Sequence, residues 1–304
     1  MAQKFRIAIA GASGYAGAEL VRLAATHPFY EITAVTSEKS AGQPVASVFP
    51  SLTGIVERRF EALAPEALTE RADAIFLALP HTKSQEPVAS CIKAGKLVVD
   101  LSADYRLKDA ATYETWYKTP HLHPHLLRDA VYGLPELHRD AIANATLVAS
   151  PGCYPTAAIL QLAPLIARGL VQPDTIVIDA KSGISGAGRS PALPYHFPEA
   201  HESLEPYKIG QHRHIPEIEQ ELSQLREEQS RLDEILGSPA ALRRLMVKEI
   251  EADAKQFADA RRTLIQEERR AVAEVRVVDE PVTVVVSEKG WVRARSGHGH
   301  DAAS

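Results

Sequence analysis

The sequence predicts an α/β fold followed by a helical tail, on three observations. Short apolar runs alternate with helical stretches in the first half, as in a parallel sheet covered by helices. A glycine-rich turn joins the first apolar run to the first helical stretch. The composition then changes near residue 222, because 29 of the 81 residues from Gln224 onward are charged, and of the 20 prolines only Pro239 and Pro281 lie there.

The bulk composition is that of an ordinary soluble protein. The net charge is −5 and 45% of the residues are hydrophobic, so no basic excess indicates nucleic acid. No apolar run reaches membrane length, and glycines interrupt the N-terminal apolar run, unlike a signal peptide. Cys91 and Cys153 are too few for a disulfide framework. We therefore expect a cytoplasmic protein.

The first apolar run and its turn have the order of a dinucleotide site. Phe5–Ala10 reads as a buried strand, Gly11, Gly14 and Gly17 follow, and a helix is expected from about Ala16 to Ala25. Glycines permit a tight turn and close backbone approach to a pyrophosphate, which the helix N-terminus then binds. This pattern favours a Rossmann-like domain in which the cofactor contacts Gly11, Ser13, Gly14, Tyr15 and Gly17.

The segment after the second predicted strand indicates which cofactor is bound. An NAD enzyme usually places an acidic residue there for the ribose 2′-hydroxyl. This chain has Ser37 and Lys39, which suit a 2′-phosphate, with Glu38 between them. We therefore expect NADP.

Two further apolar runs, "ADAIFLALPH" and "GKLVVDLSADYR", end in polar residues. Ligands of open parallel sheets gather at the carboxyl ends of strands. We expect Pro80 to contact the cofactor, and His81, Arg106 and Ser150 to contact the substrate. Arg106 could hold an anionic group, although a lone arginine more often forms an ion pair.

Cys153 is the candidate nucleophile. It follows an apolar strand end, Thr146–Ala149, and precedes a helix with Pro155 in its first turn. A helix N-terminus stabilises a thiolate and lowers the thiol pKa. The alternative is a small buried thiol, which is the interpretation we give to Cys91.

A second cluster follows downstream. "DAKSGISGAGRSP" combines a predicted strand with a Gly/Ser loop, including Ser182 and Gly183, whose N–H groups could cradle an anion. His212 and His214 lie two apart, so on an extended segment both point the same way. Either could act as a general acid or base beside a thiolate.

These motifs carry a resemblance. "GASGYAGAEL", "LALPH", "DLSADYR", "YGLPE", "SPGCYPTA", "KSGISGAGR" and "HESLEPYKIGQHRHIPEI" resemble the N-acetyl-γ-glutamyl-phosphate reductases of the aspartate-semialdehyde dehydrogenase superfamily, from about residue 4 to 221. The resemblance implies NADPH-dependent reduction of an acyl phosphate in arginine biosynthesis. It also implies that Cys153 attacks the acyl carbon and that His214, rather than His212, is the acid/base.

The resemblance stops after "EIEQEL". Residues 222–275 are charged and helical, with a coiled-coil-like seam (Leu225, Leu232, Leu236) and a break at Gly237-Ser238-Pro239. This stretch and the short β segment in 276–304 resemble bacterial topoisomerase IV, in the region after its DNA-cleavage core. The predicted domains are therefore a nucleotide-binding domain (1–149), a truncated substrate domain (150–221), a coiled-coil-like segment and a β segment with a flexible tail.

The expected chain is thus a fusion joined near residues 221–223. Its reductase activity is expected to be impaired, and the alternative is an inactive nucleotide-binding module. The part from Gln224 onward has 14 basic and 15 acidic residues, so nucleic-acid binding is not expected. No metal is expected at the histidines of residues 121–125 or at His298 and His300. The oligomeric state stays open, with a homo-oligomer as one alternative, because both resembled families associate but through regions that this chain lacks or truncates.

Overall fold

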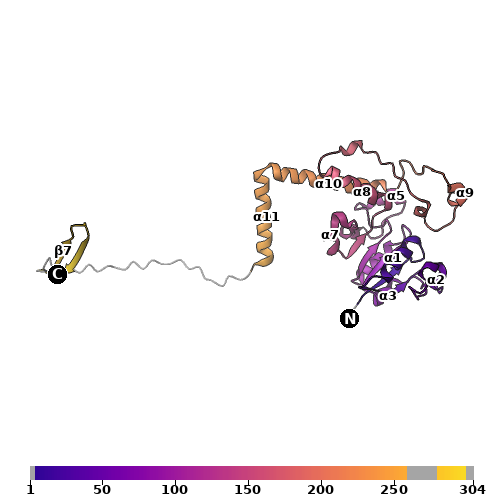
Figure 1. Cartoon of the computed structure of the whole chain (residues 1–304), viewed down its shortest axis with the longest axis horizontal. Coiled ribbons are helices and arrows are strands. Elements are labelled where there is room, and N and C mark those ends of the chain that lie inside the picture. The colour runs from indigo at the N-terminus through magenta and orange to yellow at the C-terminus, as the bar shows by residue number, and fades with distance from the viewer. Residues whose placement is uncertain (1–3, 259–278, 299–304) are drawn as a thin grey trace. The chain divides into compact units, whose positions relative to one another are not determined.

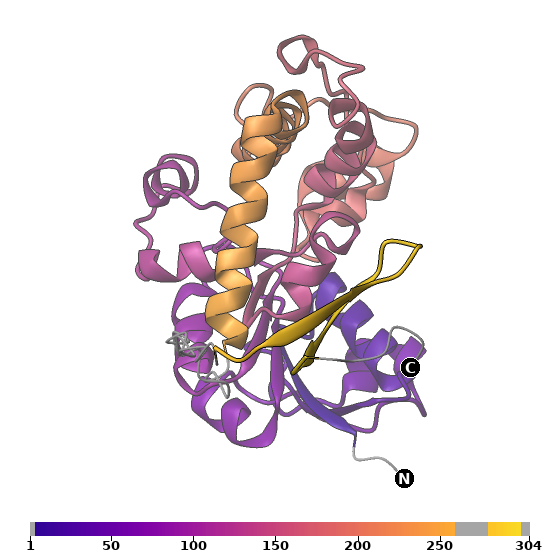
Figure 2. The same ribbon diagram turned by 90° about the vertical axis from the view of Figure 1, so that its left-hand side faces the viewer.

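A computed structural model describes residues 4–258 and 279–298. Its centre is a parallel sheet of six strands in the order β2-β1-β3-β4-β6-β5, which agrees with the predicted Rossmann-like class (Figures 1 and 2). The strands are β1 (Phe5–Ala10), β2 (Tyr30–Val35), β3 (Ala74–Leu77), β4 (Leu97–Asp100), β5 (Val131–Tyr132) and β6 (Leu147–Ala149).

Helices connect these strands and cover the sheet. They are α1 (Tyr15–Ala25), α2 (Val45–Val48), α3 (Pro65–Arg71), α4 (Gln85–Lys93), α5 (Ala110–Tyr117), α6 (Pro124–Asp129), α7 (Pro135–Ala143) and α8 (Cys153–Ile166). Later in the chain come α9 (Phe197–Ala200), α10 (Ile215–Gly237) and α11 (Pro239–Phe257).

The continuous apolar strands contribute side chains to two hydrophobic cores, one on each face of the sheet. Ile7 and Ile9 of β1 join a cluster that includes Val21 of α1. Their neighbours Ala8 and Ala10 join another cluster, with residues of α3 and α4. Since successive side chains of a strand point to opposite faces, a strand buried on both faces must be apolar throughout.

The glycine turn brings the ends of β1 and β3 together. Gly11 has φ +76°, and a Cβ there would lie 2.3 Å from the carbonyl oxygen of Ala78. A Cβ on Gly17 would lie 2.4 Å from the carbonyl oxygen of Gly11, so α1 packs directly on the turn. Strand β1 pairs with β2 on one side and with β3 on the other, so the turn lies at the point where the strand order reverses.

Helix α10 packs alongside α8 (Figure 1). It runs unbroken through the predicted junction at residues 221–223 and ends at Gly237, and α11 begins at Pro239, so the predicted break is confirmed. Of the predicted seam, Leu225 is half-buried, whereas Leu232 and Leu236 are exposed.

The prediction of a strand in "DAKSGISGAGRSP" is wrong. Residues 171–213 contain only short helical turns and α9 among the described elements, and they form the long loops around α9 in Figure 1. Val177 is 91% exposed. A strand requires a neighbour for its backbone groups, and the chain continues into helix α10 rather than into strands that could pair with this segment.

Contacts divide the chain into two units, residues 1–244 and 245–304. The second unit contains most of α11 and an antiparallel hairpin of β7 (Val282–Val286) and β8 (Val292–Ser296), which confirms the predicted short β segment. His298 is described, whereas His300 and the rest of the predicted tail lie outside the described residues. No helix in the described ranges is long and apolar enough to cross a membrane.

The glycine turn generates a stability prediction. We expect Gly11→Ala to lower the free energy of unfolding by more than Gly54→Ala, because both glycines have φ +76° but only Gly11 faces backbone within 4 Å. The left-handed conformation alone costs roughly 1–2 kcal/mol, and the collision at Gly11 adds to it. Urea unfolding of the two variants measures the difference, and equal losses would contradict the prediction.

Candidate active site

The carboxyl ends of four strands lie at one edge of the sheet. Backbone hydrogen bonds continue across it, from Ala78 N–H to Ala10, from Leu101 N–H to Leu77 and from Ser150 N–H to Asp100. The glycine turn after β1, the loops after β3 and β4, and the turn before α8 therefore follow one another along this edge. The structure thus brings most of the predicted site residues to the same side of the sheet.

The glycine turn fits a cofactor phosphate. Gly14 caps α1 but has no side chain to satisfy the N–H groups of the first turn, which lack acceptors within the helix. A Cβ there would meet only the Gly11 oxygen, at 3.6 Å, so the approach to the helix end is open. Tyr15 is half exposed at the first helical position. These donors and the helix dipole suit an anion.

Ser37 and Lys39 lie beside this turn. The Ser37 Oγ lies 2.6 Å from the Ser13 Oγ and accepts a hydrogen bond from Ser40 N–H, so this buried hydroxyl fixes the turn. Lys39 is exposed, as is its neighbour Glu38.

The loop that carries Ser182 and Gly183 is tied to the glycine turn through Arg189. Its guanidinium donates to the carbonyl oxygens of Ser13 (3.2 Å) and Val48 (3.5 Å) and lies 4.8 Å from the Phe49 ring centroid. Ser182 and Gly183 themselves are exposed. Arg189 thus anchors the end of the predicted cofactor loop to the glycine turn.

Cys153 is the first residue of α8 and is exposed. Pro155 lies buried in the first turn of this helix, as the sequence predicts. Cys91, by contrast, is fully buried in the core, and burial raises the pKa of its thiol to about 11. Of the two thiols, only Cys153 is both accessible and placed at a helix N-terminus.

His214 packs on the residue before this cysteine. A Cβ on Gly152 would lie 2.4 Å from the His214 Nε2, so the ring rests on the Gly152 backbone. Burial, and next the positive charges of His212 and Arg106, lower the pKa of His214 to about 3. At neutral pH the imidazole is therefore uncharged.

His212 lies against His214 at a ring-centroid distance of 4.7 Å. The expectation of an extended segment is wrong: residues 208–214 form turns, in which the His212 Nδ1 accepts a hydrogen bond from the His214 N–H. The two rings are also held by Tyr154, whose ring centroid lies 5.2 Å from that of His212 and 5.8 Å from that of His214. Burial, with Lys208 and Arg213, lowers the pKa of His212.

Arg106 is buried and directed at the protein. Its Nε donates to the Ser150 carbonyl (2.7 Å), its Nη2 to the Leu101 carbonyl (2.8 Å) and its Nη1 to Glu217 (3.3 Å). The guanidinium thus holds the turn before Cys153 on one side. The more common role for a lone arginine, an ion pair, is what the structure shows.

The loops after β3 and β4 are braced against each other. The His81 Nδ1 accepts from the Ala103 N–H, and the buried Asp104 accepts from the Thr82 and Ser84 N–H groups. Pro80 and His81 are exposed on this brace. The predicted residues His81 and Pro80 are thus fixed at the edge of the sheet.

Sequence reasoning missed Glu217 and Tyr132. Glu217 is buried and accepts from the Gly152 N–H and the Tyr132 hydroxyl, both at 2.8 Å. Its position three residues after His214, in the first turn of a helix with Pro216 at its second position, was a usable signal because residues at this spacing lie on the same helix face. Its partners, 65 and 85 residues away in sequence, carried no signal.

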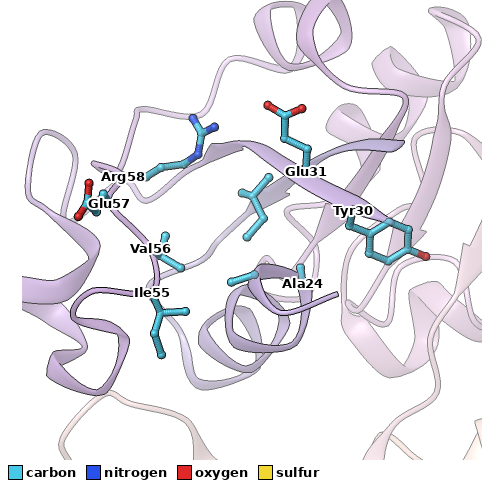
Figure 3. A pocket seen from close by; sticks show the side chains of 9 residues that line it. Ala24, Tyr30, Glu31, Ile55, Val56, Glu57 and Arg58 are labelled. Atoms are coloured by element: carbon cyan, nitrogen blue, oxygen red, sulfur yellow. The ribbon is translucent and has the colours of Figure 1, made fainter. Parts of the chain in front are cut away.

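A shallow hollow lies elsewhere, at the amino end of β2 (Figure 3). It is lined by the end of α1, the start of β2 and the loop of residues 55–58. The glycine turn follows the carboxyl end of β1, whereas this hollow flanks the opposite strand ends, so it is not part of the candidate site. In the described ranges no three His, Cys, Asp or Glu side chains gather as metal ligands.

Two family models match this chain. Residues 6–145 match the NAD binding domain of semialdehyde dehydrogenases, and residues 153–302 match the dimerisation domain of semialdehyde dehydrogenases. The chain is similar to semialdehyde dehydrogenases over both stretches. The first match holds the glycine turn, and the second begins at Cys153.

Curated relatives are similar over the first part. The N-acetyl-γ-glutamyl-phosphate reductase of Syntrophobacter fumaroxidans is 54% identical over 220 residues, and that of Geotalea daltonii is 56% identical over 221 residues. Each alignment covers 72% of this chain and 64% of the relative, so the chain spans less than two thirds of the relatives' length.

Among solved structures, an aspartate semialdehyde dehydrogenase of Candida albicans has a TM-score of 0.41 and 18% identity, covering 56% of this chain and 48% of that one. The dimerisation-domain match continues through the predicted junction to residue 302. The predicted resemblance to topoisomerase IV finds no support in these matches.

The shifted pKa of His214 generates a prediction on acid stability. Its pKa of about 3 lies below the ordinary 6.5, so within this window the unfolded chain binds a proton that the folded chain does not. Stability therefore falls as the pH falls from 6.5 to 3, by at most about 1.4 kcal/mol per unit and by less after solvent screening.

We expect His214→Gln to flatten the pH dependence of the unfolding free energy between pH 6 and 4, whatever its effect on absolute stability. Urea unfolding at each pH measures the slope. His196→Gln, at an exposed histidine, is the control. A variant curve parallel to that of the unmodified chain would contradict the assignment.

Proposed function

We propose that this chain is an N-acetyl-γ-glutamyl-phosphate reductase, which reduces the acyl phosphate to N-acetylglutamate 5-semialdehyde and phosphate in arginine biosynthesis. The observation that carries the proposal is the turn before α8. There an accessible thiol, Cys153, follows directly on the glycine against which the His214 ring packs. This turn lies at the sheet edge that also holds the glycine turn. The relatives at 54 and 56% identity support the same activity.

The proposed cofactor is NADP. Its pyrophosphate would bind at the N-terminus of α1, near Gly11, Gly14 and Gly17, and Lys39 would pair with its 2′-phosphate, with Ser13, Tyr15, Ser37, Pro80, Ser182 and Gly183 around the site. When bound, NADPH supplies the hydride that reduces the acyl group. The chain's own contribution is to bind and orient this group beside Cys153.

Cys153 and His214 divide the acyl-transfer chemistry. The Cys153 sulfur forms a bond to the acyl carbon, and the carbon–oxygen bond to phosphate breaks, which leaves a thioester. His214, whose ring packs on Gly152 directly before Cys153, is the proposed group that takes the proton of the thiol. That proton is returned to the departing phosphate. His212, whose Nδ1 accepts from the His214 backbone, orients the turn that carries His214.

The site's positive charge suits an anionic substrate. Lys208 and Arg213 lower the pKa of His212, and Arg106 and Lys208 lower that of His214, so these three cations act at the same place. Arg213 lies 5.2 Å from the Tyr117 ring centroid, at the edge of the site. Arg106 contributes its charge at a distance, because its nitrogens bind protein oxygens.

The decisive assay is phosphate-dependent reduction of NADP with N-acetylglutamate semialdehyde, the reverse reaction. We expect turnover that Cys153→Ser abolishes, because a hydroxyl is a far weaker nucleophile than a thiolate at neutral pH. Cys91→Ala, at the buried thiol, should retain turnover. Turnover that survives Cys153→Ser would reject this nucleophile.

One alternative is a catalytically inactive nucleotide-binding module, joined to a helical segment that does not complete a substrate domain. It is favoured by the extent of the relatives' similarity, about 220 residues, and by the exposure of the loops in residues 171–213. In the same assay this alternative gives NADP binding without turnover. The division into a nucleotide-binding domain (1–149), a truncated substrate domain (150–221), a helical segment (222–275) and a β segment is likewise a proposal.

The cofactor assignment has its own test. We expect Lys39→Ala to raise the KM for NADP by about tenfold while leaving the KM for NAD nearly unchanged, since an exposed ion pair with a phosphate and its hydrogen bonds is worth on the order of 1–2 kcal/mol. Lys93→Ala, on the exposed end of α4, is the control. Equal changes for both nucleotides would remove Lys39 from the 2′-phosphate site.

We also infer that the chain forms a homo-oligomer in the cytoplasm. The match of residues 153–302 to a dimerisation domain supports the self-association. The proposed partner is a second copy of the chain, and neither nucleic acid nor a membrane is part of this proposal.

A further inference from the structure

Glu217 connects the two helix ends that form the candidate site. Its side chain is 2% exposed, yet its carboxylate has three donors. The Oε1 accepts from the Gly152 N–H and the Tyr132 hydroxyl, and the Oε2 accepts from the Arg106 Nη1. A buried carboxylate is costly unless it is paired and hydrogen-bonded, and here it is both.

The bond to Gly152 is accompanied by a second contact, from the N-cap residue of α10. His214 is this N-cap, and Glu217 lies three residues later in the first turn, so both side chains lie on the same side of the helix start. The carboxylate holds the Gly152 N–H, while the His214 ring covers the position that a side chain of Gly152 would occupy. Gly152 is therefore held at two points, directly before Cys153.

Arg106 and Tyr132 make this attachment rigid. Arg106 also binds the carbonyl oxygens of Ser150 and Leu101, which follow β6 and β4. Burial and the adjacent carboxylate raise the pKa of Tyr132, so its hydroxyl stays a donor. The carboxylate thus fixes α10 to three strands of the sheet at the point where α8 begins.

We propose that Glu217 is a positioning residue that sets the placement of the Cys153 sulfur relative to His214 by holding the Gly152 N–H. The inference rests on the proposed reductase function for its kinetic consequence, but its effect on Cys153 is independent of turnover. The carboxylate binds Gly152, Tyr132 and Arg106, and it acts on the reacting sulfur through the backbone of Gly152.

The kinetic test uses Glu217→Ala, Glu217→Gln and the control Glu219→Gln, an exposed carboxylate on the same helix. We expect Glu217→Ala to lower kcat by about 10²-fold, the scale for displacing a reacting group by about 1 Å. The KM for NADP should change less than about twofold, because the glycine turn is a separate element. Glu217→Gln keeps an oxygen for the Gly152 N–H and should restore most of kcat.

Should Glu217→Ala fail to fold, Glu217→Asp replaces it, since its carboxylate is one methylene too short to hold the Gly152 N–H. A kcat for the truncated variant equal to that of Glu219→Gln would overturn the inference. Glu217→Gln no faster than Glu217→Ala would also overturn it, because charge rather than the bond to Gly152 would then matter.

A second measurement separates this inference from the proposed function. Iodoacetamide alkylates Cys153, whereas Cys91 is buried, and Cys153→Ser gives the blank rate. We expect the rate constant at pH 7 to change by at least about twofold in Glu217→Ala relative to Glu219→Gln, because the first turn of α8, which presents the sulfur, is no longer held through the Gly152 N–H.

If the unmodified chain shows no turnover, the reductase proposal fails and the alkylation rates decide this one. Unchanged alkylation rates would overturn the positioning role. A merely structural role would lower the amount of folded protein without altering the rate constant of the folded fraction.

Discussion

The buried ion pair of Arg106 and Glu217 joins residues 111 positions apart and fixes the first turns of α10 to the sheet. Such a pair is tolerated only where further hydrogen bonds compensate the loss of water. Here the guanidinium binds two carbonyl oxygens and the carboxylate binds a backbone N–H and a hydroxyl. The partners of this ion pair all lie at the edge where β4, β5 and β6 end: Leu101, Tyr132, Ser150 and Gly152. The arrangement of the candidate site depends on it.

The two halves of the first unit differ in how far their apolar side chains are buried. Up to α8, each strand has a neighbour and each face has a covering helix, so apolar side chains are buried. In residues 171–213 apolar residues such as Val177 and Ile209 are largely exposed instead. Exposed apolar surface of this kind marks a contact with another chain or a missing part of a core.

Much of the sheet could be predicted from the sequence, because buried parallel strands are continuous apolar runs. Phe5–Ala10 was predicted to the residue, and the helix after the glycine turn begins one residue before its expected start. The strand of only two residues, Val131–Tyr132, gave too short a signal. The strand expected in "DAKSGISGAGRSP" had the right local pattern, but pairing depends on a partner that local pattern does not contain.

The site was predictable in its residue types rather than in its contacts. Cys153 and the histidines stand in conspicuous local patterns, and the structure places the rings of His212 and His214 together. Their turn geometry was missed because spacing of two does not distinguish a strand from consecutive turns. Glu217 was missed because a carboxylate in a charged helix resembles a solvent-facing one until its distant partners are known.

Gly152 sets a limit on how the protein's sequence can vary. Its N–H is held by one side chain and the space beside its Cα is filled by another. Any side chain at this position would therefore have to displace the His214 ring from its place beside Cys153. The residue directly before the reactive sulfur is therefore a glycine because the His214 ring occupies the place of its side chain.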